Sequence, residues 1–257
     1  MKNIRWLPRQ RPLTVIADPF PYQQGGRDWL LVEHYSHRKG IRGRIARVDP
    51  EHPLTIEMVI ERGRHVSYPF TFTHDGDIFC APETSQEDGC VIYRLTRDGR
   101  WAEHQHVMRG QRLVDPTLFR LDDRWWLFAT EPPPSHNSTL NAYYADALEG
   151  PWTPHAANPV KRDLSSARPA GRPFTIGTRL YRPAQDCSVT YGGAVHVMEI
   201  LALTPTEFRE SIALRLEPDP SWPYPDGLHH LVVDGARVYF DAKRSHVDWL
   251  LWLRTWL

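Results

Sequence analysis

Residues 115–131 read DPTLFRLDDRWWLFATE, and this stretch decides the fold. Two largely apolar runs flank the polar pair Asp122-Asp123. A polar or Gly pair between two such runs is typical of a β-hairpin, because a tight turn there needs positive φ at its central positions. Asp115 opens the first run, and Glu131 follows the aromatic-rich second run. The stretch therefore predicts a hairpin with a carboxylate at each open end.

The same pattern occurs five times along the chain. The second turn residues are Gly26, Gly76, Asp123, Gly177 and Gly235, at intervals of 50, 47, 54 and 58 residues. Apolar segments that fit two further strands follow each of the first four hairpins. A period near 50 residues with four strands in each unit is typical of a propeller blade. The sequence predicts an all-β fold: a five-bladed β-propeller with four-stranded antiparallel blades, forming one domain over residues 1–257.

Two further points concern this architecture. A β-sandwich with irregular loops is the alternative fold, but it does not explain the period. Propellers usually complete one blade with strands from both termini. We therefore expect residues 11–16 to pair with the tryptophan-rich segment 248–257, which is too short to span a bilayer and is predicted to be a last strand or a short packing helix.

Composition excludes several classes of protein. The chain has 257 residues with 31 basic and 31 acidic side chains, so a general electrostatic grip on nucleic acid is not expected. Its three cysteines, at positions 80, 90 and 187, lack the spacing of a zinc site or a disulfide framework. The first eleven residues contain no apolar secretory core, and no segment is apolar enough for a transmembrane helix. We expect a cytoplasmic protein.

The repeat also predicts a cluster of polar side chains. The first strand of each blade lines the central channel, so residues that open these strands project toward the axis at one mouth. These residues are Asp18, Tyr68, Asp115, Arg168 and His229. The ends of the second strands add a ring of acids, namely Glu33, Glu83, Glu131, Asp186 and Asp241. We expect carboxylates about 50 residues apart in sequence to face one another around a single pocket.

Such a cluster suits chemistry on a glycosidic bond, which needs one ionised and one protonated carboxyl group. Asp18 and Asp115, each followed by Pro and an aromatic residue, are the candidates for the ionised role. Glu83, between Pro82 and two hydroxyl residues, is the candidate acid. An isolated Asp-Pro pair is often only a turn device. Its recurrence at the same point of two units favours the catalytic interpretation.

Further residues around the mouth are candidates for binding a sugar. Arg, Gln and His side chains can read hydroxyl or carboxylate groups, and aromatic faces can stack on a sugar ring. The alternative for Arg182 is a structural clamp on Asp186. The full set of predicted substrate-binding residues is Tyr68, Arg182, Gln185, Asp186, His229, His230, Glu33 and Glu131. Arginine accounts for 27 of the 31 basic residues, which fits either an anionic substrate or solvated outer strands.

Several motifs together resemble a known family. Distinctive segments occur at residues 18–20, 67–69, 82–85, 114–119, 125–128, 182–187, 191–192 and 227–230. They are similar to those of bacterial relatives of the N-terminal domain of plant glucosamine inositolphosphorylceramide transferase. That domain in turn is similar to the five-bladed propellers of arabinanases, β-xylosidases, invertases and levansucrases. The resemblance implies a carbohydrate-active or carbohydrate-binding propeller with one acidic site on the axis.

Three functions follow from these observations. The first is a glycoside hydrolase or transglycosylase that acts on a bacterial glycan through Asp18, Glu83 and Asp115. The second is a noncatalytic glycan-binding module. The third is a glycosyltransferase of glycolipid or polysaccharide synthesis, although no phosphate-binding Gly-rich loop supports it. A carbohydrate is the expected ligand and no cofactor is predicted; a structural Ca²⁺ held by channel carboxylates is the one metal site left open.

Overall fold

Four blades and a final hairpin surround a common axis in the computed structural model, which describes residues 4–8, 14–36, 42–84 and 86–244. Blade 1 contains β1 (Thr14–Gln24), β2 (Arg27–Ser36), β3 (Arg44–Val48) and β4 (Ile56–Ile60). Blade 2 contains β5 (Ser67–His74), β6 (Asp77–Glu83), β7 (Cys90–Leu95) and β8 (Trp101–Val107). Each of these sheets is an antiparallel meander in chain order.

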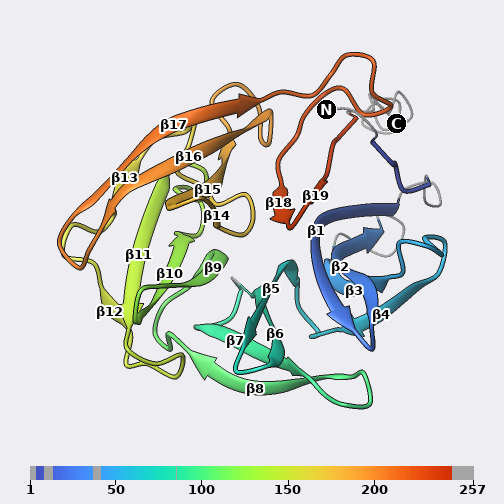
Figure 1. The fold of residues 1–257 in the computed structure, drawn as a ribbon, viewed down its shortest axis with the longest axis horizontal. Helices are drawn as coiled ribbons and strands as arrows, with labels where there is room; N and C mark the ends of the chain where they lie inside the picture. The colour runs from blue at the N-terminus through green and yellow to red at the C-terminus, as the bar shows by residue number, and fades with distance from the viewer. Residues whose placement is uncertain (1–3, 9–13, 37–41, 85, 245–257) are drawn as a thin grey trace, which may run out of the picture.

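Blades 3 and 4 repeat this order with small changes. Blade 3 contains β9 (Val114–Leu121), β10 (Arg124–Thr130), β11 (Thr139–Ala145) and β12 (Thr153–Pro154), and β13 (Lys161–Arg162) also pairs with β11. Blade 4 contains β14 (Phe174–Ile176), β15 (Arg179–Asp186), β16 (Ala194–Leu203) and β17 (Phe208–Leu216). Figure 1 shows β1, β5, β9, β14 and β18 nearest the centre of the ring.

The fifth repeat corrects the sequence prediction. It forms only the hairpin β18 (Leu231–Asp234) and β19 (Arg237–Phe240) within the described residues. The predicted propeller with four-stranded antiparallel blades is therefore confirmed, but the described part of the chain forms four such blades and not five. Of the strands expected to complete the ring, residues 14–16 belong to β1, whereas 11–13 and 248–257 lie outside the described residues. A hairpin turn predicts two strands and does not determine whether two more will join them.

Side chains join the final hairpin to blade 1. Tyr239 packs against the apolar residues of blade 1, and Arg237 forms an ion pair with Asp28. Blade 4 approaches from the other side, where the backbone N–H of Leu231 donates to the carbonyl of Ala170 over 2.7 Å. Gly171 makes this approach feasible, since a Cβ at that position would lie 1.9 Å from the Leu231 carbonyl oxygen. These contacts connect the hairpin to its neighbours on both sides of the ring.

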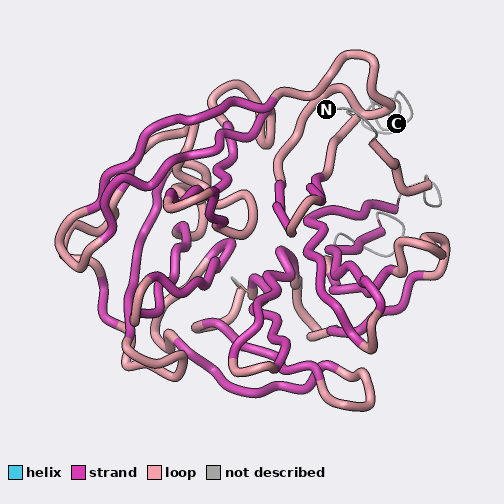
Figure 2. Tube along the Cα trace, in the orientation of Figure 1, coloured by secondary structure: helices cyan, strands magenta, loops and turns pink. Residues whose placement is uncertain are grey.

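Aromatic rings fill the spaces between neighbouring blades. Tyr22 of blade 1 meets Trp101 of blade 2 at a centroid distance of 5.5 Å. Phe72 and Trp125 make the equivalent contact between blades 2 and 3 at 5.7 Å. Such edge-to-face pairs bury large apolar areas at the blade interfaces. Figure 2 shows only strands and loops, and no described segment forms a helix that could cross a membrane.

A strained bulge opens the inner strand of each of the first three blades. Asp18, Tyr68 and Asp115 have φ values of 51°, 42° and 51°, and each precedes a proline. The pairing register of the strand shifts at each of these positions. Positive φ is uncommon for residues other than Gly and costs about 1–3 kcal/mol, whereas a bulge re-aims a side chain. The repeated Xaa-Pro pairs therefore mark where the chain turns a side chain out of the regular pleat.

Candidate functional site at the axial mouth

Antiparallel pairing brings the predicted acids to one edge of the blades. Ala17, next to Asp18, is the register partner of Glu33, and Ser67 at the start of β5 faces Glu83. The backbone N–H of Asp115 donates to Glu83 Oε2 over 3.2 Å and so links blade 3 to blade 2. All four carboxylates are less than 9% exposed. The contacts are consistent with the prediction that acids from separate repeats come together at one mouth.

An arginine from blade 4 completes one half of this mouth. Arg168 Nε donates to Asp115 Oδ2 over 2.6 Å, and its Nη1 donates to Asn137 Oδ1 over 2.9 Å. Gln185 Nε2 donates to the carbonyl of Pro169 over 3.0 Å and lies 3.5 Å from Asp115 Oδ2. Burial alone would lower the pKa of Arg168, but the Asp115 carboxylate raises it well above its usual value. This half of the mouth holds a fixed ion pair.

The other half holds a histidine between two carboxylates. His229 Nδ1 lies 2.6 Å from Asp241 Oδ1, and its Nε2 lies 3.6 Å from Asp18 Oδ1. The backbone N–H of Asp18 donates to Asp241 Oδ2 over 3.0 Å. Burial acts to lower the pKa of His229, but Asp241 and Asp18 outweigh it and raise that pKa to about 9. His229 is therefore an imidazolium at neutral pH, and it holds the pKa of Asp241 below its ordinary value against the effect of burial.

Two carboxyl groups of the mouth bind protons at unusually high pH. Burial raises the pKa of Asp18 to about 7; His229 opposes this shift, and Asp241 and Asp115 add to it. Burial, then the charges of Asp18 and Glu83, raise the pKa of Glu33 well above its usual value. Glu33 therefore keeps its proton to a higher pH than an ordinary glutamate, and Asp18 is close to half protonated at pH 7. The motif around Asp18 predicted an ionised carboxylate, so the protonation of Asp18 differs from that expectation.

Small residues make room for these groups. Gly43 lies beside Glu33, and a Cβ at Gly43 would be 2.7 Å from Glu33 Oε1. The N–H of Gly43 donates to His65 Nδ1 over 2.9 Å, which leaves the ring proton on Nε2, 3.6 Å from Glu33 Oε1. Burial lowers the pKa of His65, so this ring is neutral at pH 7. Glu33 therefore lies beside a neutral ring N–H.

One exposed aromatic ring stands over both halves of the mouth. Tyr191, in the β15–β16 loop, is 44% exposed. The Arg168 guanidinium carbon lies 5.0 Å from the centre of the Tyr191 ring, and His229 meets that ring edge-on at 5.5 Å. Gly192 permits this approach, because its φ is 57° and a Cβ there would be 2.3 Å from His229 Cβ. Lys243 Nζ also lies 5.9 Å from the ring centre, so Tyr191 is a partly exposed aromatic ring with two cations over it, beside buried carboxylates.

Comparison with known proteins assigns this chain to a family. Residues 8–221 match the family described as "Glucosamine inositolphosphorylceramide transferase 1, N-terminal". The chain belongs to that family. The glucosamine inositolphosphorylceramide transferase 1 of rice (Oryza sativa subsp. japonica) is 34% identical over 207 residues, covering 77% of this chain and 28% of the rice protein. The transferase of Arabidopsis thaliana is 31% identical over 210 residues, covering 77% and 27%.

These relatives limit what the family match implies. The chain spans about a quarter of the length of the curated relatives that it matches. Both are plant proteins, so they give no support to the expected bacterial origin. The family match agrees with the resemblance drawn from the motifs, including those around Asp18, Asp115 and Tyr191.

Solved structures with a similar fold include a galactanase, a family 117 glycoside hydrolase and an arabinanase. An exo-β-1,3-galactanase from Clostridium thermocellum gives a TM-score of 0.58 at 12% identity and covers 81% of this chain and 53% of its own. A family 117 glycoside hydrolase from Zobellia galactanivorans gives 0.57 at 14% identity, with coverages of 81% and 71%. The α-L-arabinanase of Cellvibrio cellulosa gives 0.51 at 16% identity, with coverages of 76% and 77%. At these identities the similarity shows the fold alone.

Three predicted binding residues have their partners elsewhere. Arg182 donates to both Glu210 carboxylate oxygens, at 2.6 and 2.7 Å, and to the Ser166 carbonyl. Its structural partner is Glu210 and not Asp186, which accepts from Ser188 and Arg215. Glu131 accepts a hydrogen bond from Asn141 within blade 3. Among the interactions of the described residues, none joins these three side chains to the carboxylates of the axial mouth.

Two further predicted residues are buried among the inner strands. The Tyr68 hydroxyl lies 2.9 Å from Thr117 Oγ1 and accepts from the N–H of Gly171 over 2.9 Å. His230 packs its ring 4.5 Å from that of Phe20. Burial lowers the pKa of His230 to about 3, so it is neutral. Tyr68 and His230 therefore support the inner strands, while Gln185 and His229 remain at the mouth.

Four residues of the mouth are not among the catalytic or substrate-binding residues predicted from the sequence. Two of them, Arg168 and Asp241, occupy repeat-equivalent positions and were placed only in the predicted ring of polar side chains. Tyr191 lies in a loop without a counterpart in the repeat, and only the family motif at residues 191–192 marked it. Asn137 follows the Pro-rich run 132–134, and no sequence motif selected it. The repeat pattern therefore located the mouth better than it located its individual side chains.

The mouth also contains one group of potential metal ligands. Ligand atoms of Asp18, His229 and Asp241 lie within 4.8 Å of one another. Metal binding by His229 would require the loss of a ring proton, whereas the two carboxylates raise its pKa to about 9. Ca²⁺ also prefers an all-oxygen ligand set. The proton on His229 is therefore the cation that this arrangement favours, and a structural Ca²⁺ stays a prediction.

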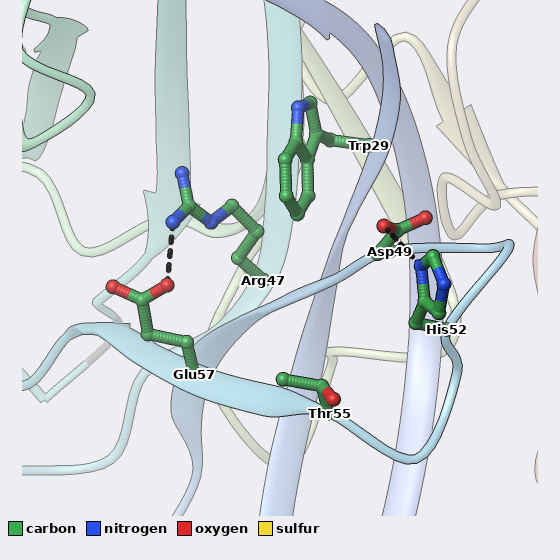
Figure 3. A pocket seen from close by; sticks show the side chains of 6 residues that line it. All are labelled: Trp29, Arg47, Asp49, His52, Thr55 and Glu57. Atoms are coloured by element: carbon green, nitrogen blue, oxygen red, sulfur yellow. Dashed lines mark hydrogen bonds and ion pairs between the residues drawn. The ribbon is translucent and has the colours of Figure 1, made fainter.

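A hollow on the outer strands of blade 1 offers a contrast. It has a volume of about 230 Å³ and is lined by Trp29, Arg47, Asp49, His52, Thr55 and Glu57. Figure 3 shows that its charged groups pair with one another, Arg47 with Glu57 and His52 with Asp49. Arg47 also lies 4.4 Å from the centre of the Trp29 ring. Because Glu57 and His52 are exposed, this hollow lacks the buried carboxyl groups of the axial mouth and is a weaker candidate.

Proposed function

We propose that the axial mouth binds a glycan and that its carboxyl groups act on a glycosidic bond, by hydrolysis or by transfer. The observation that carries the proposal is the coexistence, within one mouth, of carboxyl groups whose pKa values are shifted in opposite directions. Burial raises the pKa of Asp18 to about 7 and that of Glu33 well above its usual value, whereas His229 holds the pKa of Asp241 below its ordinary value against the effect of burial. Glycosidic chemistry needs such a division, because the leaving oxygen takes a proton while an ionised group acts on the opposite side.

Asp18 has the properties of the proton-transferring group. A general acid or base is most effective when its pKa lies near the working pH, and that of Asp18 is about 7. His229 and Asp241 hold Asp18 in place and adjust its proton affinity. Asp115, paired with Arg168, supplies negative charge that would stabilise a positively charged sugar ring. Glu83 remains a proposed acid, held next to Asp115 by the backbone of blade 3.

Sugar recognition would rest on the groups that border these acids. The exposed face of Tyr191 suits stacking against the C–H face of a sugar ring. The Gln185 amide and the Arg168 guanidinium lie beside Asp115 and offer donors for hydroxyl groups. The propeller fold shared with the galactanase and the arabinanase supports this proposal, as does the transferase named in the plant relatives.

The decisive experiment compares two buried Asp→Asn substitutions. Asp18→Asn removes the proton-transferring group, and Asp186→Asn is the control, because Asp186 ends a second strand but pairs with Ser188 and Arg215. Oligosaccharides first found to bind on a glycan array are then assayed for cleavage and for transfer. We expect Asp18→Asn to reduce turnover by about 100-fold or more and Asp186→Asn to leave it near wild type. Equal turnover by wild type and Asp18→Asn would contradict the assignment.

A second function, noncatalytic glycan binding, is favoured by one specific observation. Arg168 donates a hydrogen bond to the Asp115 carboxylate, and the backbone N–H of Asp115 donates to Glu83. Two of the three predicted catalytic acids therefore hold one another in place. A rigid, preformed site of this kind suits recognition. In that case wild type binds array oligosaccharides without cleaving them, and Asp18→Asn changes affinity only. A product that forms only with an added nucleotide-sugar donor would instead indicate the glycosyltransferase alternative.

A further inference from the structure

A groove lies between blades 2 and 3, outside the axial mouth. Its volume is about 530 Å³, within the range of about 300–1,000 Å³ that is typical of ligand sites. Its lining includes Met108, Gln111, Asn141, Tyr143, Glu149 and Trp152. β8 ends at Val107 and β11 begins at Thr139, at the same edge of the blades as Glu83 and Asp115. The groove therefore begins on the side of the molecule that carries the mouth.

The groove contains a fixed aromatic platform. Trp152 is half-buried and packs against the apolar cluster that includes Tyr143 and Leu148. Its Nε1 donates to the Leu148 carbonyl over 3.2 Å, which sets the orientation of the indole. Gly150 precedes it with φ of 92°, and a Cβ at Gly150 would lie 3.0 Å from Trp152 Cδ1. The local chain thus holds the indole in one orientation beside the groove, and no side chain of residue 150 crowds it.

Polar groups line the rest of the groove. Gln111 and Glu149 are exposed, whereas Asn141 is 7% exposed. Asn141 Nδ2 donates to Glu131 Oε1 over 3.4 Å, which is long for a hydrogen bond and therefore weak. Met108, at the rim, has φ of 58° in a turn in which the N–H of Gln111 donates to the Met108 carbonyl over 3.1 Å. Amide and carboxylate groups around an aromatic face are the chemistry that binds sugar hydroxyls and C–H faces.

One short segment separates this groove from the axial mouth. It begins at Glu131, which accepts from Asn141 at the groove. It ends near Asn137, which accepts from Arg168 at the mouth over 2.9 Å. Residues 131–137 therefore have the groove at one end and the axial ion pair at the other. A chain of linked sugars that starts at the axis crosses this segment to enter the groove near Asn141, and Trp152 lies farther along the groove, beyond the other end of β11.

We propose that the groove between blades 2 and 3 binds the sugar units that extend from the unit held at the axis, with Trp152 as the stacking platform. This inference rests on the proposed binding of a glycan at the axial mouth. It names the substrate class as an oligosaccharide or a polysaccharide chain and not a single sugar. Affinity should then rise with chain length, and the increase should depend on Trp152.

The test uses a glycan array on which each backbone is present as single sugars and as chains of increasing length. Wild type should bind longer chains more tightly, and Trp152→Ala should reduce that gain by about tenfold, equal to about 1.4 kcal/mol, while binding of the shortest ligands persists. Trp29→Ala is the matched control, since Trp29 is also half-buried but belongs to blade 1. Glu149→Trp, at an exposed lining position, would fill the groove without altering the core. Like Trp152→Ala, it should reduce the gain in affinity with chain length.

Each outcome separates the two proposals. An unchanged length dependence in Trp152→Ala and Glu149→Trp, both folded by thermal unfolding, would overturn the groove assignment. Equal affinity of wild type for short and long chains would also overturn it, while leaving the axial site intact. Loss of binding at every length in Arg168→Lys, together with the length-specific loss in Trp152→Ala, supports both. Absence of binding to any array member would contradict the proposed function, and the groove assignment would fail with it.

Discussion

The two halves of the axial mouth use the same kinds of charge in different ways. On the side of blades 3 and 4, Asp115 is paired with Arg168, which keeps its proton at any physiological pH. On the side of blade 1 and the final hairpin, Asp18 and Asp241 face His229, whose pKa is about 9. The first half carries fixed charges, whereas the second contains groups that exchange protons near neutral pH. Proton transfer therefore belongs to the second half, and the first half positions and balances charge.

The largest effect is expected from breaking the fixed pair. Arg168→Met would leave Asp115 buried without its counter-charge, and loss of one partner of a buried pair costs about 3–5 kcal/mol. Urea unfolding at pH 7 measures this loss. Arg215→Met is the control, because Arg215 is half exposed and its pairing with Asp186 is worth about 0–1 kcal/mol. Similar losses in the two variants would show that the Arg168 pair is not a special feature of the mouth.

A smaller, pH-dependent effect should mark the titrating half. The folded-state pKa of His229, about 9, exceeds its ordinary value of 6.5. The stability that its charge provides is therefore complete below pH 6.5 and is lost as pH rises through 9. Between pH 7 and 9 the free energy of unfolding should fall by about 2 kcal/mol in wild type.

His229→Gln is the matching variant, because it keeps a polar side chain of similar size but cannot titrate. His229→Gln also raises the pKa of Asp18, so the comparison is made in an Asp18→Asn background, which removes this second titration. In that background the fall in unfolding free energy between pH 7 and 9 should be smaller with His229→Gln than without it, as measured by urea unfolding at several pH values. Equal falls with and without His229→Gln would remove His229 from the titrating half.

The smallest effect is expected at Tyr191, whose aromatic ring contacts Arg168 in one half of the mouth and His229 in the other. Tyr191→Leu removes an aromatic face that is 44% exposed and should weaken binding of an array-selected glycan by about tenfold. Tyr191→Phe keeps the face and should retain affinity within about twofold. Calorimetric titration measures both. A loss in Tyr191→Phe as large as in Tyr191→Leu would assign the contact to the hydroxyl and not to the ring.

Much of the fold could be predicted because its signals are local. Pairs such as Asp75-Gly76 and Asp122-Asp123 specify hairpins by their backbone conformation alone, and their period predicts blades. The number of complete blades depends on which distant strands pair. The turn at Asp234-Gly235 gave no information about that pairing, and the fifth blade was therefore predicted wrongly.

The candidate site, like the fold, has one part that could be predicted from the sequence and one part that could not. Repeat-equivalent positions predicted that Asp18, Glu83 and Asp115 would gather, because the topology requires it. Protonation could not be predicted, since the pKa of Asp18 depends on burial and on His229 and Asp241, which are more than 200 residues away in sequence. Neighbouring residues of a strand point to opposite faces. Gln185 therefore faces Asp115, whereas Arg182, three residues earlier, pairs with Glu210.

The most direct test of this account is the titration of Asp18 itself. Carboxyl-carbon NMR of protein labelled at aspartate, with Asp18→Asn to assign the signal, measures its pKa without any ligand. The account predicts a midpoint near pH 7 in wild type. It also predicts a higher midpoint in His229→Gln, because that variant loses the positive charge that favours the carboxylate. A midpoint below about 5, or no change in His229→Gln, would contradict the division of the mouth into a fixed half and a titrating half.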